Sequence, residues 1–247
     1  MIDLILIGIG TGSLDHLTLG AIHAINQADL ILIPEKGPDK ADLADLRRTL
    51  CAEVLTNPAT RLASFTLPTR DPTIPDYRQR VDQWHDAIAH IWRDTIAAHP
   101  EAQTVALLVW GDPALYDSTL RIAARLTDTS VRAIPGIMSL NALTAAHAIT
   151  LNEIGAPFLV TTGRRLTDEG WPAGIDTLVV MLDGDTAFRH LAPEGITIWW
   201  GAYVGMPQQC LIAGPLTEAA PRIIAARTAL RAQHGWIMDC YLLRKAG

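Results

Sequence analysis

Two apolar stretches each lead directly into a glycine loop: Leu4–Gly12 reads LILIGIGTG, and Val105–Pro113 reads VALLVWGDP. Short, continuously apolar runs that end at turn residues are typical of strands covered on both faces. A strand that stops at glycine leaves bare backbone N–H groups at its carboxyl end, and small ligands dock at this edge of open α/β sheets. The two loops therefore predict two halves of one cofactor site.

The N-terminal part of the chain alternates between strand and helix patterns. Further strands are expected at Leu30–Ile33, where Pro34 should end the strand, and at Val131–Ile134. Helical spacing of apolar residues occurs at Thr18–Ala28, Ala41–Val54, Asp76–Ala98, Thr119–Leu126 and Ser139–Ala148. This βαβα order predicts a mainly parallel sheet with helices on both faces.

The pattern changes near residue 150, after which strand patterns follow one another more closely. They cover 158–161, 178–182, 197–200, 211–213 and 236–243, with one long helix at 217–232. We therefore expect an α/β fold of two α/β domains: residues 1–150 with a mainly parallel sheet, and residues 151–247 with a mixed sheet.

Composition excludes several classes of protein. The 247 residues are 49% hydrophobic, enough to bury a substantial core, and the net charge of −6 argues against a general nucleic-acid binder. The three cysteines form no CxxC pair. His85 and His90 are five residues apart, a spacing that does not bring two side chains onto one face of a helix, so no metal site is expected. No run of 18 apolar residues occurs, so no membrane-spanning helix is expected. The widely spaced cysteines suit a reducing compartment, so we expect the protein in the cytoplasm.

The first loop, Gly8–Ser13, resembles the dinucleotide fingerprint GxGxxG, with Glu35 about where an acid would hold a ribose. A nicotinamide-dependent oxidoreductase is therefore one hypothesis, and a purely structural glycine turn is another. Two features weaken the first hypothesis. Ser13 replaces the third glycine, and Leu14–Leu17 separates the loop from the helix whose N-terminus would hold a pyrophosphate.

The second loop is a common tripeptide, and a simple turn would explain it if it stood alone. Gly111 permits close approach of a ligand, and Pro113 fixes the backbone as it leaves the strand. Asp112 could accept a hydrogen bond from an amine or cap neighbouring N–H groups.

Three motifs in order strengthen the cofactor interpretation. The Gly8–Gly12 loop is followed by Leu17-Thr18, GDPxxY occupies Gly111–Tyr116, and PGIMS occupies Pro135–Ser139. Over essentially its whole length the chain resembles the tetrapyrrole (corrin and porphyrin) methyltransferases. The chain departs from the usual pattern at Thr11, where most members have proline, and at Ser13-Leu14, where they have Asp-Pro.

This resemblance implies that S-adenosylmethionine (SAM) binds in a cleft between the two domains, that S-adenosylhomocysteine is the product, and that the protein is a homodimer. The implied cofactor-binding residues lie on the three motifs and on three later segments: Gly10, Thr11, Gly111, Asp112, Pro113, Leu115, Met138, Ser139, Leu182, Ala202 and Trp236. Core packing is an equally good interpretation of Leu182 and Trp236.

Segments 36–43, 161–166, 180–184 and 234–239 look like one branch of this family. That branch methylates precorrin-5 at carbon 1 of the macrocycle in aerobic cobalamin biosynthesis and releases acetate. The same fold could also act on another precorrin, or on the modified histidine of an elongation factor, as diphthine synthase does.

An anionic macrocycle would be held by charge-assisted pairs to arginine or lysine. Lys36, Lys40, Arg164 and Arg165 are the candidates, since each is expected in a loop or just after a strand. Methyl transfer from a sulfonium needs alignment and exclusion of water more than a strong base. Release of acetate needs a positioned water, for which the sequence offers Asp39, Tyr116 and Asp183 without choosing among them. His16 and His147 are weaker candidates for residues of the site, with no role assigned to them.

Overall fold

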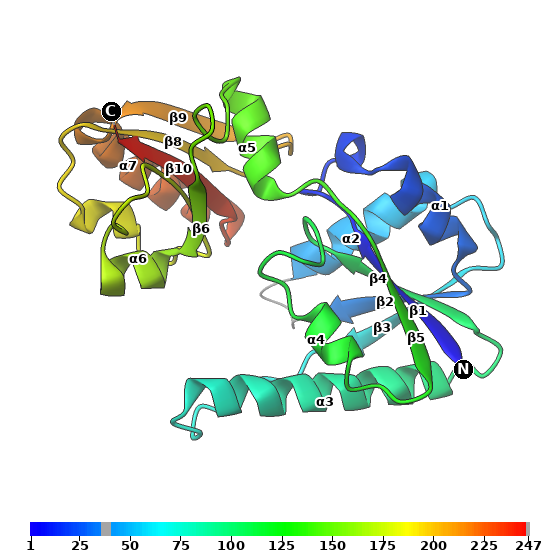
Figure 1. Cartoon of the computed structure of the whole chain (residues 1–247). Helices are drawn as coiled ribbons and strands as arrows, with labels where there is room; N and C mark the ends of the chain where they lie inside the picture. The colour runs from blue at the N-terminus through cyan, green and yellow to red at the C-terminus, as the bar shows by residue number, and fades with distance from the viewer. Residues whose placement is uncertain (36–40, 246–247) are drawn as a thin grey trace. The chain divides into compact units, whose positions relative to one another are not determined.

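The computed structural model describes residues 1–35 and 41–245, with only the backbone for 41 and 42, and it divides into two compact units. The first unit is Met1–Ile137 and the second is Met138–Gly247, and each contains its own five-stranded sheet (Figure 1). The division falls earlier than the expected boundary near residue 150. The reason is that helix α5 (Ser139–His147) packs against strands β8 (Ile196–Ala202) and β10 (Asp239–Lys245) of the second sheet.

The sheet of the first unit is entirely parallel, as expected, with strand order β3-β2-β4-β1-β5. Its strands are β1 (Ile2–Gly8), β2 (Leu30–Glu35), β3 (Arg61–Thr66), β4 (Thr104–Val109) and β5 (Thr129–Ile134). Its helices are the 3-10 turn η1 (Leu14–His16), α1 (Leu19–Gln27), α2 (Ala41–Val54), α3 (Tyr77–Ala97) and α4 (Thr119–Ala123).

Alternation along the strands builds a core on each face of this sheet. Leu4 and Leu6 of β1 face α3 and α4, whereas Ile5 and Ile7 face α1 and α2. Figure 1 shows α3 along one face of the sheet and α1 with α2 on the other. Strands buried on both faces are apolar at every position, which explains why the runs at β1, β2 and β4 lack polar alternation.

Two features of the first unit differ from the sequence prediction. Strand β3 was not expected, because as an edge strand it buries only Ala63 and Phe65 and has a weak pattern. Strand β2 continues through Pro34 to Glu35. Pairing of β2 with β4 ends at Leu32, so the missing N–H of Pro34 lies where the strand has no neighbour on that side.

The second unit carries the mixed sheet that was expected, with order β6-β7-β10-β8-β9. Strands β6 (Phe158–Thr162) and β7 (Thr177–Met181) are parallel, and β10, β8 and β9 (Cys210–Pro215) pair antiparallel. The helices are α5, α6 (Gly163–Glu169), α7 (Leu216–His234) and the 3-10 turn η3 (Ala187–His190). Strand β10 begins at Asp239, three residues later than expected. None of the helices in the described part of the chain is long and apolar enough to cross a membrane.

The buried face of β2 allows a test of the core. Ile31 is fully buried in the cluster formed with α1 and α2. We expect Ile31→Ala to lower the free energy of unfolding by about 2–5 kcal/mol, because it leaves a cavity between sheet and helices. Chemical denaturation followed by circular dichroism measures this loss. Leu19→Ala, at an exposed position of α1, is the control and should change stability by less than about 0.5 kcal/mol.

Candidate cofactor site

The glycine loops lie at the switch point of the first sheet. Strands β1 and β4 are neighbours, but α1 after β1 covers one face and α4 after β4 covers the other. When the helices that follow two adjacent strands lie on opposite faces of the sheet, a crevice forms at the carboxyl ends of these strands. Open α/β sheets bind ligands in such crevices. The two loops meet there: Gly111 N–H donates to the Gly10 carbonyl at 2.7 Å, and Gly10 N–H donates back at 3.3 Å.

A third loop, at the end of β5, packs onto the first two through glycine. A Cβ on Gly8 would lie 2.6 Å from the Gly136 nitrogen and 2.8 Å from the Gly111 carbonyl oxygen. A Cβ on Gly136 would lie 2.7 Å from the Gly8 carbonyl carbon. Real side chains do not approach backbone so closely, so the three loops can meet only because these positions lack side chains.

Asp112 fastens the second loop to the third. Its side chain is buried, one oxygen accepts from the Ala114 N–H at 2.8 Å, and the other accepts from the Gly136 N–H at 2.9 Å. Of the two roles that the sequence left open, the structure therefore shows the capping role. These two hydrogen bonds hold the second and third loops together.

The first loop has its own internal support. The Thr11 hydroxyl lies 2.7 Å from His16 Nδ1, and a Cβ on Gly10, whose φ is +68°, would meet the His16 Cβ at 2.6 Å. Ser13 caps η1, and Thr18 separately caps α1 by accepting from the Ala21 N–H. The turn η1 thus stands between the loop and α1, as the inserted Leu14–Leu17 segment predicted.

Glu35, the expected ribose ligand of the dinucleotide hypothesis, is engaged within the protein. It forms an ion pair with Arg48, which also donates to Ser64 at 2.8 Å. Hydrogen bonds from Ser64 and then from Arg48 lower the pKa of Glu35 below its usual value. This arrangement holds α2 to strands β2 and β3 and weakens the nicotinamide interpretation.

In the second unit, the three later candidates lie on one edge of the sheet. Leu182 directly follows β7 and Ala202 ends β8, while the Trp236 segment leads into the antiparallel strand β10, whose first residue pairs with Ala202. Leu182 and its counterpart after β8, Tyr203, both adopt left-handed backbone, with φ of +52° and +49°. Strained non-glycine residues cluster at ligand sites.

These residues differ in their surroundings. The Leu182 side chain is largely exposed at 65%, whereas Ala202 is fully buried. Tyr203 donates its hydroxyl proton to the Trp236 carbonyl and packs edge-on against the Trp236 ring, with centroids 5.0 Å apart. For Leu182 simple core packing is therefore wrong.

Asp183, a candidate for positioning water, is held inside the second unit. One oxygen accepts from the Asp185 N–H at 3.0 Å, and the other accepts from the Ala187 N–H and the Tyr241 hydroxyl, both at 2.7 Å. Burial, together with the charge of Asp183, raises the pKa of Tyr241, which therefore remains a proton donor. Three donors on a buried carboxylate favour a structural role for Asp183.

A buried ion pair that the sequence reasoning missed supports the same turn. Arg227 donates from Nε to Asp239 at 2.9 Å and from its terminal nitrogens to the carbonyls of Asp183 and Gly184. Trp200 also donates its indole N–H to Asp239, at 2.8 Å. An arginine four residues after the fully buried Ile223 on α7 was the available sequence signal.

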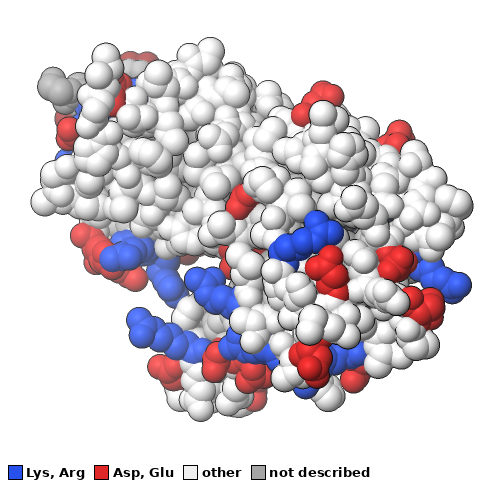
Figure 2. Space-filling model, turned by 45° about the vertical axis from the view of Figure 1, so that its right-hand side comes forward, with Lys and Arg blue, Asp and Glu red and all other residues white. Residues whose placement is uncertain are grey.

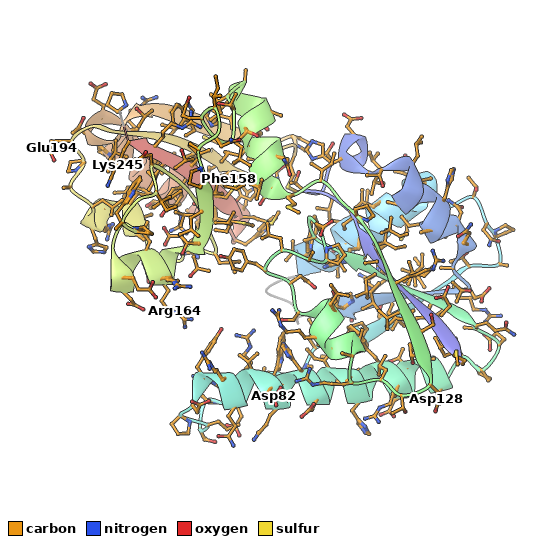
Figure 3. The ribbon with its side chains drawn as sticks, in the orientation of Figure 1. Asp82, Asp128, Phe158, Arg164, Glu194 and Lys245 are labelled. Carbon is orange, nitrogen blue, oxygen red and sulfur yellow. The ribbon has the colours of Figure 1, made fainter. Side chains whose placement is uncertain are left out.

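The remaining predicted residues include three that the structure does not describe. Lys36, Asp39 and Lys40 lie outside the described residues. Arg164 and Arg165 come just after β6, as expected, and lie in the first turn of α6, where Figure 3 labels Arg164. Arg165 forms an ion pair with Glu169 at 2.8 Å.

The other candidates divide by their surroundings. Tyr116 is exposed in left-handed backbone, with φ of +49°. His147 contacts the Trp200 carbonyl through Nε2 at 3.0 Å.

Charge on the surface is mixed. On the face drawn in Figure 2, lysine and arginine side chains lie next to acidic ones. Arg125, for example, forms ion pairs with both Asp82 and Asp86. Within the described ranges, no group of three or more His, Cys, Asp or Glu side chains could hold a metal ion.

A parallel sheet with glycine loops at its switch point, followed by a mixed-sheet unit, defines an α/β protein with a candidate ligand site at the strand ends of the first sheet. A sequence profile of the tetrapyrrole (corrin/porphyrin) methylases matches residues 3–220. The chain is 45% identical to a precorrin-6A synthase (deacetylating) from a Sinorhizobium species, over 99% of this chain and 96% of that protein.

Solved structures agree with this match. The crystal structure of CobF, a cobalamin synthesis related protein from Corynebacterium diphtheriae, superposes with a TM-score of 0.83 at 38% identity, covering all of both chains. Uroporphyrin-III C-methyltransferase from Thermus thermophilus, solved with S-adenosylhomocysteine, shares the fold, with a TM-score of 0.59 at 18% identity over 98% of this chain and 97% of that one. The chain belongs to the tetrapyrrole methylase family.

The contact of the three glycine loops at Gly8, Gly111 and Gly136, here called the glycine junction, can be tested at Gly136. We expect Gly136→Ala to destabilise the first unit by about 1–3 kcal/mol, because the added methyl group collides with the backbone of the other two loops. Urea denaturation measures the change. Gly20→Ala, on α1, is the matched control. Its added Cβ would lie 3.7 Å from side-chain atoms of Thr18 and Ile134, which is ordinary contact, so the free energy of unfolding should stay equal or rise. Equal stability of the two variants would contradict the junction.

The contribution of the Arg227–Asp239 ion pair to stability can be tested in the same way. Arg227→Met leaves Asp239 buried without its cation, so we expect a loss of about 3–5 kcal/mol of unfolding free energy. Arg222→Met, at an exposed position of the same helix, should be close to neutral. Thermal and chemical denaturation of both variants compare the two positions, and equal losses would show that Arg227 has no special role.

Proposed function

We propose that this protein is a SAM-dependent C-methyltransferase that methylates precorrin-5 at carbon 1 and releases acetate, forming precorrin-6A in aerobic cobalamin biosynthesis. The observation that carries the proposal is 45% identity over almost the full length of a protein named for this reaction. A precorrin-2 C(20)-methyltransferase matches at 31% over only 55% of the chain, which disfavours a different precorrin as substrate.

For the cofactor, we propose that Gly10, Thr11, Gly111, Asp112, Pro113, Leu115, Met138, Ser139, Leu182, Ala202 and Trp236 hold SAM. Two observations support a fit. The Gly10–Gly111 junction brings side-chain-free backbone to the carboxyl edge of the first sheet, and the exposed, strained Leu182 offers apolar surface at a strand end of the second.

The chemistry asks mainly for alignment. SAM supplies an electrophilic methyl group on a sulfonium, and the reacting carbon must approach it in line and away from water. The fixed loops serve this need, since Asp112 locks two of them together and leaves little freedom to reorganise. No base of raised pKa is required at the glycine junction.

Release of acetate is a separate hydrolytic step. Water adds to the acetyl carbonyl carbon, and the bond from that carbon to the macrocycle breaks. Acetate leaves, and the macrocycle keeps the electron pair and takes up a proton. Of the three candidates for positioning this water, Asp183 is committed to structural hydrogen bonds, so Tyr116 and Asp39 are the better proposals.

We further propose that Lys36, Lys40, Arg164 and Arg165 pair with carboxylates of the macrocycle, and that the protein works as a homodimer in the cytoplasm. The four residues are proposed because each is expected in a loop or just after a strand, the cytoplasm is proposed because the widely spaced cysteines suit a reducing compartment, and the dimer is an expectation of the family resemblance. Light scattering on a size-exclusion column tests the dimer directly.

The proposed function predicts a ligand-specific gain in thermal stability and a defined pair of products. S-adenosylhomocysteine should raise the melting temperature by mass action, whereas NAD and NADP should not. Precorrin-5 with SAM should gain one methyl group by mass spectrometry and release acetate in equal amount. Stabilisation by nicotinamides alone would overturn the methyltransferase proposal, and methylation without acetate would overturn the precorrin-5 assignment.

A further inference from the structure

A separate pocket lies within the first unit, beside the Gly111 loop. It has a volume of about 180 Å³ and is lined by Pro34 of β2, Leu67 just after β3, and Val109 and Trp110 at the end of β4. The pocket therefore opens at the carboxyl edge of the parallel sheet, one residue from Gly111. None of the residues proposed above as SAM or substrate ligands lines it.

Arg47 of α2 places a cation in this largely apolar pocket. Its side chain is more than nine-tenths buried, and its guanidinium carbon lies 5.1 Å from the centre of the Trp110 ring. Phe65, Trp84 and Trp92 supply apolar surface. Burial lowers the pKa of Arg47 to about 10, so the group stays charged at neutral pH but in an environment that penalises the charge.

The hydrogen-bonding capacity of Arg47 is only partly used by the described residues. Nε donates to the Leu108 carbonyl at 3.0 Å, and one terminal nitrogen donates to the Leu43 carbonyl at 3.1 Å. A guanidinium has five N–H groups, so most of its donors have no acceptor within the described part of the chain. Both partners are neutral carbonyls, and no carboxylate of that part lies within ion-pair distance.

Asp117 is the acidic residue that lines the pocket, and it is occupied elsewhere. Its carboxylate accepts from both the backbone N–H, at 2.6 Å, and the hydroxyl of Thr119. It supports the charge of Arg47 through space without pairing with it. A buried cation without a paired anion is costly, and the energetically natural partner is an anion brought by a ligand.

We propose that this pocket binds one carboxylate-bearing alkyl arm of the tetrapyrrole substrate, with Arg47 gripping the carboxylate and the aromatic walls covering the methylene groups. A planar guanidinium matches a carboxylate through two parallel hydrogen bonds. The identity of the ligand rests on the proposed function. Such a ligand would explain why an arginine, and not an apolar residue, occupies this buried position of α2.

The pocket lies where a bound arm could help to align the macrocycle for methyl transfer. Trp110 lines the pocket and directly precedes Gly111, the junction residue, so an arm held by Arg47 would fix the macrocycle next to the proposed donor loop. Arg47 is thus a positioning residue for methyl transfer. Binding energy from a remote arm can align the reacting carbon.

The first test uses binding alone, so it does not depend on turnover. Uroporphyrin III, which carries acetate and propionate arms, should quench the fluorescence of the pocket tryptophans and bind the wild type, whereas its methyl ester should bind at least about tenfold more weakly. Arg47→Met should remove this preference for the free acid, and Arg47→Lys should restore part of it. An unchanged preference in Arg47→Met would overturn the proposal.

Arg48→Met is the matched control, since Arg48 is the next residue on α2 but pairs with Glu35 outside the pocket. Its porphyrin binding should equal that of the wild type. Sodium acetate provides a second arm of the experiment. Acetate that displaces uroporphyrin III at millimolar concentration would assign the pocket to free acetate and overturn the substrate-arm proposal.

Kinetics complete the test. With precorrin-5, Arg47→Met should raise KM at least about tenfold, while S-adenosylhomocysteine binds as in the wild type by calorimetry. If Arg47→Met raised KM but also weakened the binding of S-adenosylhomocysteine and lowered the melting temperature, Arg47 would have a merely structural role. Failure of the wild type to turn over precorrin-5 would instead reject the proposed function. The porphyrin experiment would still show whether the pocket binds a carboxylate-bearing arm through Arg47.

Discussion

The hydrogen bonds of Asp112 join two loops that end different strands of the first sheet, and the candidate site depends on that connection. The carboxylate accepts from a backbone N–H of its own loop and from Gly136, 24 residues further along the chain. Gly8 and Gly136 make the contact possible, because a Cβ on either would collide with backbone of the neighbouring loops. Catalysis by alignment needs a rigid edge of this kind, because reacting groups held in place have already lost the freedom that would otherwise slow them.

The second unit reaches a comparable rigidity by other means. Its strand-end turn at Asp183–Gly184 is held by a buried carboxylate with three donors and by Arg227, whose charge is balanced by Asp239. Buried ionic groups are weak sources of stability, but removal of one partner is costly, so such a network fixes one geometry. Leu182, immediately before this turn, is thereby kept exposed in a strained conformation.

Arg47 shows the contrast between a balanced and an unbalanced buried charge. Arg227 and Arg47 are buried to nearly the same extent, at 9% and 8% exposure. Arg227 contacts a carboxylate, whereas the acceptors of Arg47 in the described residues are neutral carbonyls. This difference separates an arginine that completes the fold from one whose partner we place on the substrate.

Local pattern in the sequence was sufficient for most elements of the fold. Apolar runs predicted β1, β2 and β4, and helical spacing predicted α2 with its observed bounds. It failed at β3, where an edge strand buries only two side chains, and at α6, a short helix that directly follows β6. The earlier start of the second unit was also not visible in the sequence, because α5 belongs to that unit through the strands it packs against and not through its own periodicity.

The sequence by itself determined most of the strands and helices, the glycine loops and the family, because these depend on neighbouring residues and on motif spacing. Only the tertiary structure decided what Asp112 and Asp183 do, which arginines are buried, and that Arg47 lines a pocket beside the Gly111 loop. The physical reason is that charge, burial and hydrogen bonding at these residues come from partners far away in the chain. Which partners meet is settled by packing against the two sheets.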